Sequence, residues 1–411
     1  MRILIITTNF TPELTGIGKY SGEMATWLAN NGNNIRIVCS APYYPEWKVN
    51  KKYSGWKYTT ERANNTDILR CPIWVPTNVT TLKRILHLGS FALSSFPVII
   101  KQALWKPDVV ICVEPPIFNS MNAILVSKLC SAKSILHVQD FEVDAAFNLG
   151  MIKAMWLKKL ICKLEICLLK QFTNVSTISK SMLKMLDEKM VPKHKQLLFP
   201  NWVDTSFISP LKTSSYRDSL NIPDEKIVAM YSGNMGEKQG LEIIITAARH
   251  LPEIQFVMCG SGAALNRLKN TANHLSNIIW LELQPYEKLN DFLNLADVHL
   301  LPQQADAADL VMPSKLTGML SSGKPVVATA DEDTEVYAVV KGCGLLVKPA
   351  EDIKFAEAIR TLANDTELRI KLGKNARKYA ESHLNFQAIM MQFSKELSSL
   401  LKVPLEKAEL E

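Results

Sequence analysis

Two lysines in the second half of the chain stand where a pair of phosphates could bind. Lys238 lies in a glycine-containing loop, and Lys315 follows Pro313 and Ser314 at the start of an expected helix. A proline early in a helix with a serine beside it is typical of a helix N-terminus, and helix N-termini attract phosphate. The two segments would form a diphosphate pocket. The alternative is two surface lysines without a ligand.

A second loop of this kind lies near the N-terminus. Residues 3–6 predict a strand, and Gly16 and Gly18 precede an expected helix. Glycine lets the backbone approach a ligand closely. The spacing is GxG and not the dinucleotide pattern GxGxxG, because Ser21 occupies the third position. A plain tight turn between strand and helix is therefore the alternative.

Short apolar runs predict the elements that must position these residues. Strands are expected in the first half at 35–41, 107–116, 133–140 and 174–179, and in the second half at 226–233, 254–262, 277–282, 298–302, 324–330 and 344–349. Helical segments are expected between them, including 21–31, 118–131 and 151–171. Strands that alternate with helices predict parallel sheets whose loops gather at the carboxyl ends of the strands.

The order of these elements predicts two doubly wound α/β domains that face a cleft. The chain has 411 residues, which suits two domains. We expect a first domain at 1–200, a second at 201–384 and a C-terminal helix at 385–411 that packs back toward the first. The segment FPNWVDTSFISPLK, at 199–212, reads as the joint.

Charge is distributed unevenly along the chain. Residues 1–200 contain 25 Lys and Arg against 13 Asp and Glu, whereas residues 201–411 contain 22 against 27. A basic first half favours an anionic partner such as a membrane surface or a phosphorylated substrate. The eight cysteines form no CxxC pair, which favours buried thiols in a reducing cytoplasm.

The motifs in their order resemble the retaining GT-B glycosyltransferases of family 4 over essentially the whole chain. The resemblance rests on the glycine loop at 16–18, NWVD at 201–204, ADVHLLP, SGKPVVAT, GLLVKP and LGKNARKYA. Within that family, HVQDFEVDAAFNLG and MPSKLTGMLSSGKPV are similar to the colanic-acid-type exopolysaccharide enzymes. The resemblance implies a nucleotide-sugar donor such as GDP-fucose, a lipid-linked saccharide acceptor, retention of configuration, no cofactor and no metal. No nucleic-acid partner is expected.

The resemblance also assigns residues. Gly16 and Gly18 would offer backbone N–H groups to the donor, and the second half would bind it through a set of loop residues: Gly233, Asn234, Lys238, Gln284, Ser314 and Lys315. The chain departs from the family pattern where Asn234 and Gln239 replace an arginine and a lysine. The family's two glutamates are absent, and Gly318 occupies the place of the second. Individual nucleotide contacts therefore cannot be transferred.

Asp140 is the expected catalytic residue. The family carries an acidic residue or a histidine at this place, and Asp140 follows the expected strand at 133–140. A carboxylate could orient the acceptor hydroxyl, accept its proton and favour an oxocarbenium-like transition state. Helix capping is the alternative for Asp140, and His137 is expected to be a core residue. The acidic triplet at 331–333 resembles a metal motif of the other glycosyltransferase fold and is interpreted as an exposed turn.

Two segments of the first half could contact a membrane. Residues 81–106 are apolar with basic and Trp flanks, and residues 151–172 are amphipathic and rich in lysine. Ordinary helices packed on the core are the alternative. We expect a cytoplasmic protein, peripheral on the inner face of the plasma membrane. A nucleotide-sugar epimerase and a non-catalytic two-lobed sugar-binding protein share the expected architecture.

Overall fold

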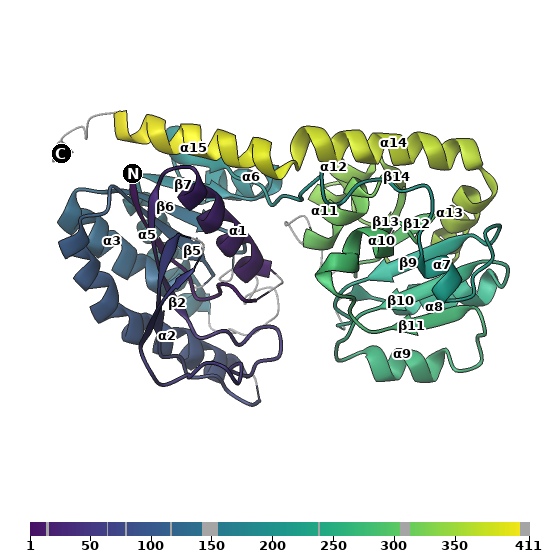
Figure 1. Ribbon diagram of the computed structural model, residues 1–411, viewed down its shortest axis with the longest axis horizontal. Coiled ribbons are helices and arrows are strands. Elements are labelled where there is room, and N and C mark those ends of the chain that lie inside the picture. Colours follow the sequence, from purple (N-terminus) through teal and green to yellow (C-terminus); the bar gives the residue numbers. More distant parts are fainter. Residues whose placement is uncertain are drawn as a thin grey trace. The chain divides into compact units, whose positions relative to one another are not determined.

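The computed structural model describes residues 1–13, 16–63, 65–78, 80–115, 117–141, 155–236, 239–304 and 313–402 (Figure 1). The chain forms two compact units. The first comprises Met1–Phe199 with Met390–Glu411, and the second comprises Pro200–Ile389. Each unit contains its own sheet, so the predicted class of two doubly wound α/β domains is confirmed.

The first unit contains an eight-stranded sheet in the order β3-β4-β2-β1-β5-β6-β7-β8. Its strands are β1 (Arg2–Ile6), β2 (Asn34–Ser40), β3 (Thr59–Ala63), β4 (Thr66–Cys71), β5 (Val109–Glu114), β6 (Lys133–Val138), β7 (Asn174–Thr177) and β8 (Gln196–Leu198). All pairings are parallel except β3 with β4. The antiparallel edge strand β3 was not predicted, because its sequence TTERA has no apolar run.

Helices connect these strands on both faces of the sheet. They are α1 (Gly16–Asn30), α2 (Thr81–Lys101), the short η1 (Gln102–Trp105), α3 (Phe118–Cys130), α5 (Met155–Gln171), α6 (Lys180–Glu188) and η2 (Lys193–Lys195). The connection from β1 to β2 runs along the sheet in the opposite direction to those from β4 to β5 and from β5 to β6. Because such crossovers are right-handed, α1 covers one face, and α2 and α3 cover the other (Figure 1).

The second unit contains a six-stranded parallel sheet in the order β11-β10-β9-β12-β13-β14. Its strands are β9 (Val228–Ser232), β10 (Gln255–Cys259), β11 (Ile278–Leu281), β12 (Val298–Leu301), β13 (Val326–Thr329) and β14 (Gly344–Val347). Its helices are α7 (Tyr216–Ser219), α8 (Glu242–His250), α9 (Leu265–Thr271), η4 (Tyr286–Lys288), α10 (Leu289–Leu293), α11 (Ser314–Ser321), α12 (Glu335–Val340), α13 (Asp352–Asn364), α14 (Thr366–His383) and the start of α15 (Phe386–Lys402).

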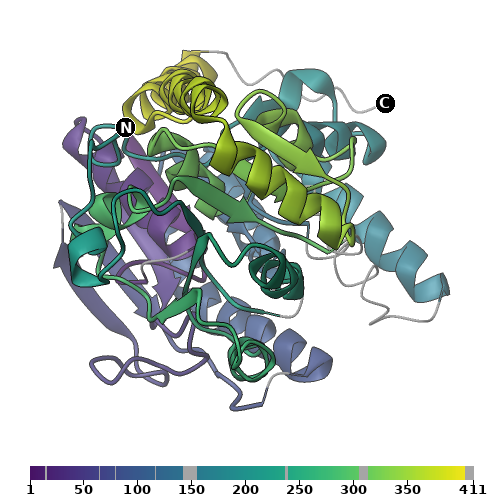
Figure 2. The ribbon, with the colours of Figure 1, turned by 90° about the vertical axis from the view of Figure 1, so that its right-hand side faces the viewer.

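The second sheet is buried on both faces, which explains the continuous apolar runs in its sequence. Along β9, Ala229 and Tyr231 pack with α8 and α13, whereas Val228 and Met230 pack with α10, α11 and α12. Figure 2 shows helices on both sides of this sheet. Strands alternate their side chains between faces, so a strand with two covered faces has no polar side to display.

Helices α14 and α15 are separated by a break at Leu384 and Asn385, where the predicted C-terminal helix begins. There the carbonyl of Leu384 accepts a hydrogen bond from the Val203 amide at 2.8 Å. The Asn385 side chain donates to Thr205 Oγ1 at 2.6 Å and accepts from the Ala388 amide at 2.9 Å. A segment near the start of the second unit therefore pairs with the break, and Asn385 acts as the N-cap of α15.

Candidate donor site and carboxylate

The strand order of the second sheet marks where a ligand can bind. Chain direction along the sheet reverses between β9 and β12, because β10 and β11 lie to one side and β13 and β14 to the other. In open parallel sheets, ligands bind outside the carboxyl ends of the strands at such a switch point. The loop that follows β9 and helix α11, which follows β12, supply residues at this point.

Lys315 and Gly233, which the sequence predicts in one pocket, lie together there. A Cβ built on Gly233 would be 3.5 Å from Lys315 Nζ. The ammonium donates a hydrogen bond to the Tyr231 hydroxyl at 2.9 Å and lies 4.4 Å from the centre of the Tyr231 ring. That hydroxyl donates in turn to the Asn234 carbonyl at 2.6 Å. Tyr231 thus fixes Lys315 against the backbone that ends β9.

Sequence reasoning missed Tyr231, because a tyrosine inside an apolar strand reads as core. Its ring is indeed fully buried in the core of the second unit. Burial raises the pKa of Tyr231, so its hydroxyl stays protonated and can donate to Asn234 while it accepts from Lys315. The signal that could have found it is its position, because the last inward residues of a strand at a switch point border the ligand edge.

The glycines of this edge allow two loops to pack backbone against backbone. A Cβ on Gly260 would overlap the carbonyl oxygen of Gly233, and one on Gly262 would overlap that of Met235. Both glycines have positive φ, 142° and 154°. The loops are joined by hydrogen bonds from the Gly233 amide to the Cys259 carbonyl at 3.0 Å and from the Met235 amide to the Ser261 carbonyl at 2.8 Å.

The other predicted donor residues lie in different surroundings. The side chain of Asn234 lies between Gly236 and Gly262. Ser314 is exposed and is the first residue of α11, as predicted for a helix N-terminus. Gln284 follows β11, and its amide is bonded to the Tyr216 hydroxyl at 2.7 Å and to the Glu282 carbonyl at 2.7 Å. Lys238 lies outside the described residues.

The side chain of Gln239 adds an unsatisfied hydrogen-bond acceptor to this loop. Its amide oxygen is buried and has no hydrogen-bond partner within the part of the chain that the structure describes. A buried acceptor without a donor costs free energy unless a ligand or water supplies one. Gln239 stands where the family carries a lysine, so this position keeps a polar group with a different charge.

In the first unit, Asp140 lies at the carboxyl edge of the sheet, two residues beyond β6, and its side chain is exposed. The adjacent Gln139 is anchored, because its amide donates to the Glu114 carbonyl at 2.9 Å. An exposed carboxylate on an anchored strand end can meet an acceptor hydroxyl. Asp140 therefore keeps the position that its predicted role needs, and the role stays a prediction.

His137 is a core residue, as predicted. Its ring is buried, Nδ1 lies 2.9 Å from Ser176 Oγ, and Nε2 lies 3.0 Å from Gln139 Nε2. Burial lowers the pKa of His137 to about 3, so the ring is neutral at physiological pH.

Gly16 and Gly18 serve two different local needs. Gly16 has φ +57°, and a Cβ there would meet nothing within 4 Å. Gly18 lies in the first turn of α1, where a Cβ would be 2.6 Å from the Glu13 Cβ. Glu13 is buried and accepts hydrogen bonds from the amides of Tyr43 at 2.9 Å and Tyr44 at 3.0 Å. Gly18 thus makes room for a buried carboxylate, and donor contact by either glycine stays a prediction.

The acidic triplet at 331–333 leads into α12. The Asp331 carbonyl accepts from the Thr334 hydroxyl at 2.7 Å, and Thr334 caps the helix through the Tyr337 amide at 3.2 Å. Across the described ranges, no three His, Cys, Asp or Glu residues are grouped as metal ligands would be.

Known proteins are similar to this chain in sequence and in fold. Residues 15–202 match the family described as "Glycosyl transferase 4-like domain", and residues 212–379 match "Glycosyl transferases group 1". The putative colanic acid biosynthesis glycosyl transferase WcaI of Escherichia coli (strain K12) is 40% identical over 409 residues, which are 96% of this chain and 98% of that relative.

Two solved structures illustrate the shared fold. Sucrose-phosphate synthase from Thermosynechococcus elongatus superposes with a TM-score of 0.78 at 16% identity, over 97% of this chain and 98% of the other. Anabaena Alr3699/HepE in complex with UDP-glucose superposes with a TM-score of 0.69 at 15% identity, over 97% and 100%. At these identities the likeness establishes the two-domain fold alone.

Proposed function

We propose that this chain transfers a sugar from a nucleotide-sugar donor with retention of configuration. The chain belongs to the GT-B glycosyltransferases, with a glycosyl transferase 4-like first domain and a group 1 second domain. The observation that supports this most is the fixed position of Lys315. Its ammonium is held against Gly233 at the switch point of the second sheet, where a diphosphate would need a cation.

The proposed reaction needs a cation at the departing diphosphate and a carboxylate at the acceptor hydroxyl. The acceptor hydroxyl oxygen forms a bond to the anomeric carbon while the bond from that carbon to the diphosphate oxygen breaks with its electron pair. Lys315 would stabilise the negative charge on the departing nucleoside diphosphate. Asp140 would orient the acceptor hydroxyl, whose proton passes to this carboxylate or to the departing phosphate. Since Lys315 supplies the cation, we expect transfer to continue in the presence of EDTA.

We propose that the acceptor is a lipid-linked saccharide of exopolysaccharide synthesis and the donor a GDP-sugar such as GDP-fucose. The support is the E. coli relative, whose name places it in colanic acid biosynthesis. The test is a mass-detected transfer assay of the full chain with a membrane extract and a panel of GDP-, UDP- and ADP-sugars. Transfer from a GDP-sugar is the expected result. Conversion of the donor without an acceptor would instead identify an epimerase, and binding without chemistry a sugar-binding protein.

We further propose that the first unit binds the surface of an anionic membrane. Helices α2, α3 and α5 lie next to one another on one face of the sheet, and η1 continues α2. Together they expose a set of large apolar side chains, here named the apolar face: Leu82, Ile85, Leu86, Leu93, Phe96, Leu104, Phe118, Met121, Leu125, Leu129, Trp156, Leu160 and Leu164. Among the described residues of the second unit, the exposed large apolar ones are fewer: Leu211, Leu283, Tyr286, Ile353 and Ile370.

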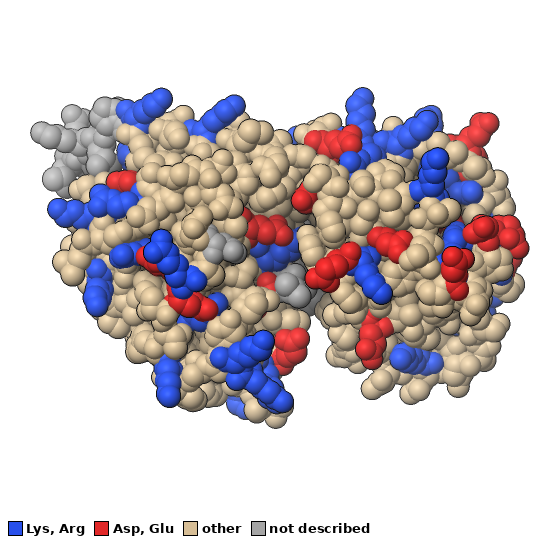
Figure 3. Space-filling model, in the orientation of Figure 1, with Lys and Arg blue, Asp and Glu red and all other residues tan. Residues whose placement is uncertain are grey.

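The charges around the apolar face favour an anionic surface. Helices α2, η1, α3 and α5 contain one acidic residue among them, Glu165. Glu165 is buried and bonded to Lys189 Nζ at 2.6 Å, so it offers no exposed negative charge. Basic side chains outnumber acidic ones over the first unit on the side drawn in Figure 3. None of the helices that the structure describes is both long and apolar enough to span a bilayer.

A further inference from the structure

A second basic site lies at the opposite edge of the second sheet from the donor site. It is a pocket of about 470 Å³ between one face of α14 and the segment that leads into β13. We call it the amino-edge pocket. The charged residues that line it are Asp297, Lys324, Arg369, Lys374, Arg377, Lys378 and Glu381. Pockets of this size commonly take small molecules.

The charge of the amino-edge pocket is strongly positive. Both of its acids already have cationic partners, because Asp297 accepts from Arg217 Nη2 at 2.8 Å and Glu381 accepts from Arg377 Nε at 2.7 Å. The second unit as a whole has 19 Lys and Arg against 23 Asp and Glu. The pocket therefore concentrates positive charge within the more acidic half of the protein.

Lys324 is a half-buried cation of this pocket. Its side chain is half-buried, and it makes no hydrogen bond or ion pair to any residue of the described ranges. Burial lowers the pKa of Lys324; the Asp297 carboxylate opposes this, and Arg217 and Arg369 add to it. A half-buried ammonium beside other cations costs free energy that a bound anion would offset.

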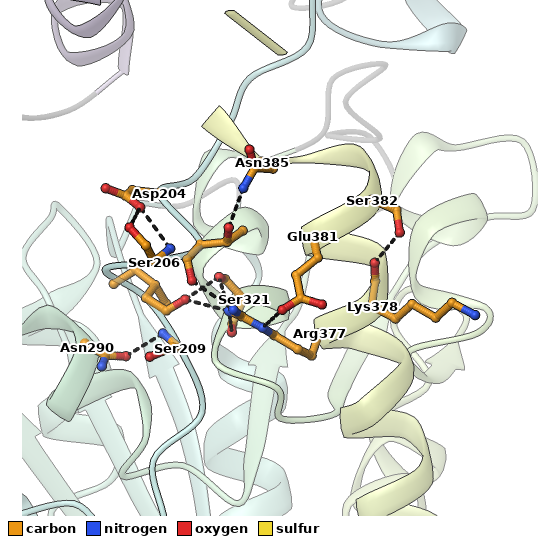
Figure 4. Close-up of polar contacts among 12 residues, drawn as sticks. Asp204, Ser206, Ser209, Asn290, Ser321, Arg377, Lys378, Glu381, Ser382 and Asn385 are labelled. Carbon is orange, nitrogen blue, oxygen red and sulfur yellow. Dashed lines mark hydrogen bonds and ion pairs between the residues drawn. The ribbon is translucent and has the colours of Figure 1, made fainter. Parts of the chain in front are cut away.

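Arg377, which lines the pocket, also anchors the chain segment at 205–208. Arg377 donates from Nη1 to the carbonyls of Ile208 at 2.8 Å and Ser321 at 2.9 Å, and from Nη2 to the carbonyl of Thr205 at 2.9 Å (Figure 4). Lys378, the next residue on α14, points away from this cluster in Figure 4. Arg377 is thus committed to the fold, whereas Lys324 and Lys374 are available to a ligand.

We propose that the amino-edge pocket binds a soluble phosphate compound, with Lys324 as its main cation and Lys374 beside it. Three observations support this proposal. The pocket has the volume of a small-molecule site, and its cations outnumber its acidic residues, which already form ion pairs. The half-buried Lys324 ammonium has no hydrogen bond or ion pair to a described residue. The site is distinct from the donor site, because its residues precede β12 and β13 whereas the donor residues follow β9 and β12.

Calorimetry with inorganic pyrophosphate tests the proposal on the full chain. Lys315→Ala serves as the background, since it weakens any diphosphate binding at the donor edge. In that background we expect Lys324→Met to weaken pyrophosphate binding about 10- to 100-fold, the usual loss for a charge-assisted contact. Lys324→Met should not lower the melting temperature without ligand, because it removes an unpaired cation. Lys371→Met, on an exposed position of α14 outside the pocket, should leave the affinity unchanged.

Three results would overturn the proposal. The first is equal pyrophosphate affinity with and without Lys324→Met. The second is an equal loss from Lys371→Met. The third is an affinity for pyrophosphate no higher than for sulfate at equal ionic strength, which would mean charge screening only. If Lys324→Met fails to fold, the exposed Lys374→Met replaces it, and unchanged affinity in that variant contradicts the proposal equally.

Discussion

At the scale of single residues, the proposed donor site depends on how one lysine is held. An exposed lysine samples many rotamers, and fixing it costs entropy on binding. Tyr231 already holds Lys315 through a hydroxyl at 2.9 Å and a ring face at 4.4 Å. The sequence predicted the lysine and its helix, because proline and serine mark a helix start. It could not predict Tyr231, because the contact joins residues 84 positions apart.

Replacing Lys315 with alanine should weaken nucleoside diphosphate binding. We expect a loss of about 10- to 100-fold, because one charge-assisted contact contributes roughly 1.5–3 kcal/mol. Calorimetry with GDP and with UDP measures it. Lys341→Ala is the matched control, since the Lys341 ammonium also lies over a tyrosine ring, that of Tyr337 on α12. Unchanged affinity for both nucleotides would remove Lys315 from the donor site.

Asp140→Asn should keep the fold and donor affinity but lose most transfer activity. The amide has nearly the same shape as the carboxylate, but it can neither accept a proton nor carry the negative charge. Initial rates with saturating donor measure the loss, which should be about 100-fold or more for a positioned general base. Asp108→Asn is the control, because Asp108 is partly exposed and pairs with Arg2 at the start of β5. A rate near that of the unaltered enzyme would leave Asp140 as a bystander.

At the scale of elements, the sequence predicts strands well where apolar residues run continuously. All the strands predicted for the second half are present, because both faces of that sheet are covered. Of the edge strands of the first sheet, β3 is polar and β8 has only three residues, so their backbone pairing depends on neighbours and not on their own pattern. The split between α14 and α15 likewise depends on a distant partner, Thr205.

Gly260→Ala should damage the donor edge. A methyl group there would overlap the Gly233 carbonyl, and φ of +142° is unfavourable for alanine. We expect a loss of about 1–3 kcal/mol in stability from the strain, with weaker nucleotide binding. Urea unfolding and calorimetry measure the two effects. Gly342→Ala is the control, because a Cβ at Gly342 meets nothing within 4 Å. Equal stability of the two variants would contradict the backbone packing described here.

Two buried strand histidines should make the protein sensitive to acid. Burial lowers the pKa of both His137 and His299 to about 3. Below the unfolded value near 6.5 the unfolded chain binds protons that the native rings do not, so stability falls as pH decreases toward 3. Each histidine contributes a slope of up to about 1.4 kcal/mol per pH unit. Melting temperatures between pH 7 and pH 5 should fall less steeply in His137→Asn; a parallel decline would contradict neutral burial.

At the scale of the whole molecule, the two units differ in the surface they present. The first carries the apolar face with basic residues around it, and the second carries a mixed, more acidic surface. The proposed transfer, with a donor from solution and an acceptor in a lipid surface, would make use of such a division. Apolar insertion contributes roughly 25 cal/mol per Å² of buried surface, and each nearby lysine adds about 1 kcal/mol on an anionic bilayer.

Charge placed on the apolar face should therefore detach the protein from membranes. Met121→Glu with Leu125→Glu adds two carboxylates to exposed positions of α3. We expect co-sedimentation with phosphatidylglycerol liposomes to fall strongly, while GDP-sugar binding stays intact because the substitutions leave all the predicted donor residues unchanged. Rising salt should weaken the unaltered protein's binding only in part, since salt screens the lysines but not apolar insertion. Ile353→Glu, an exposed apolar position of the second unit, is the control and should sediment normally. If the α3 variant sediments as well as this control does, α2, α3 and α5 are not the membrane surface, and the acceptor must reach the enzyme by another route.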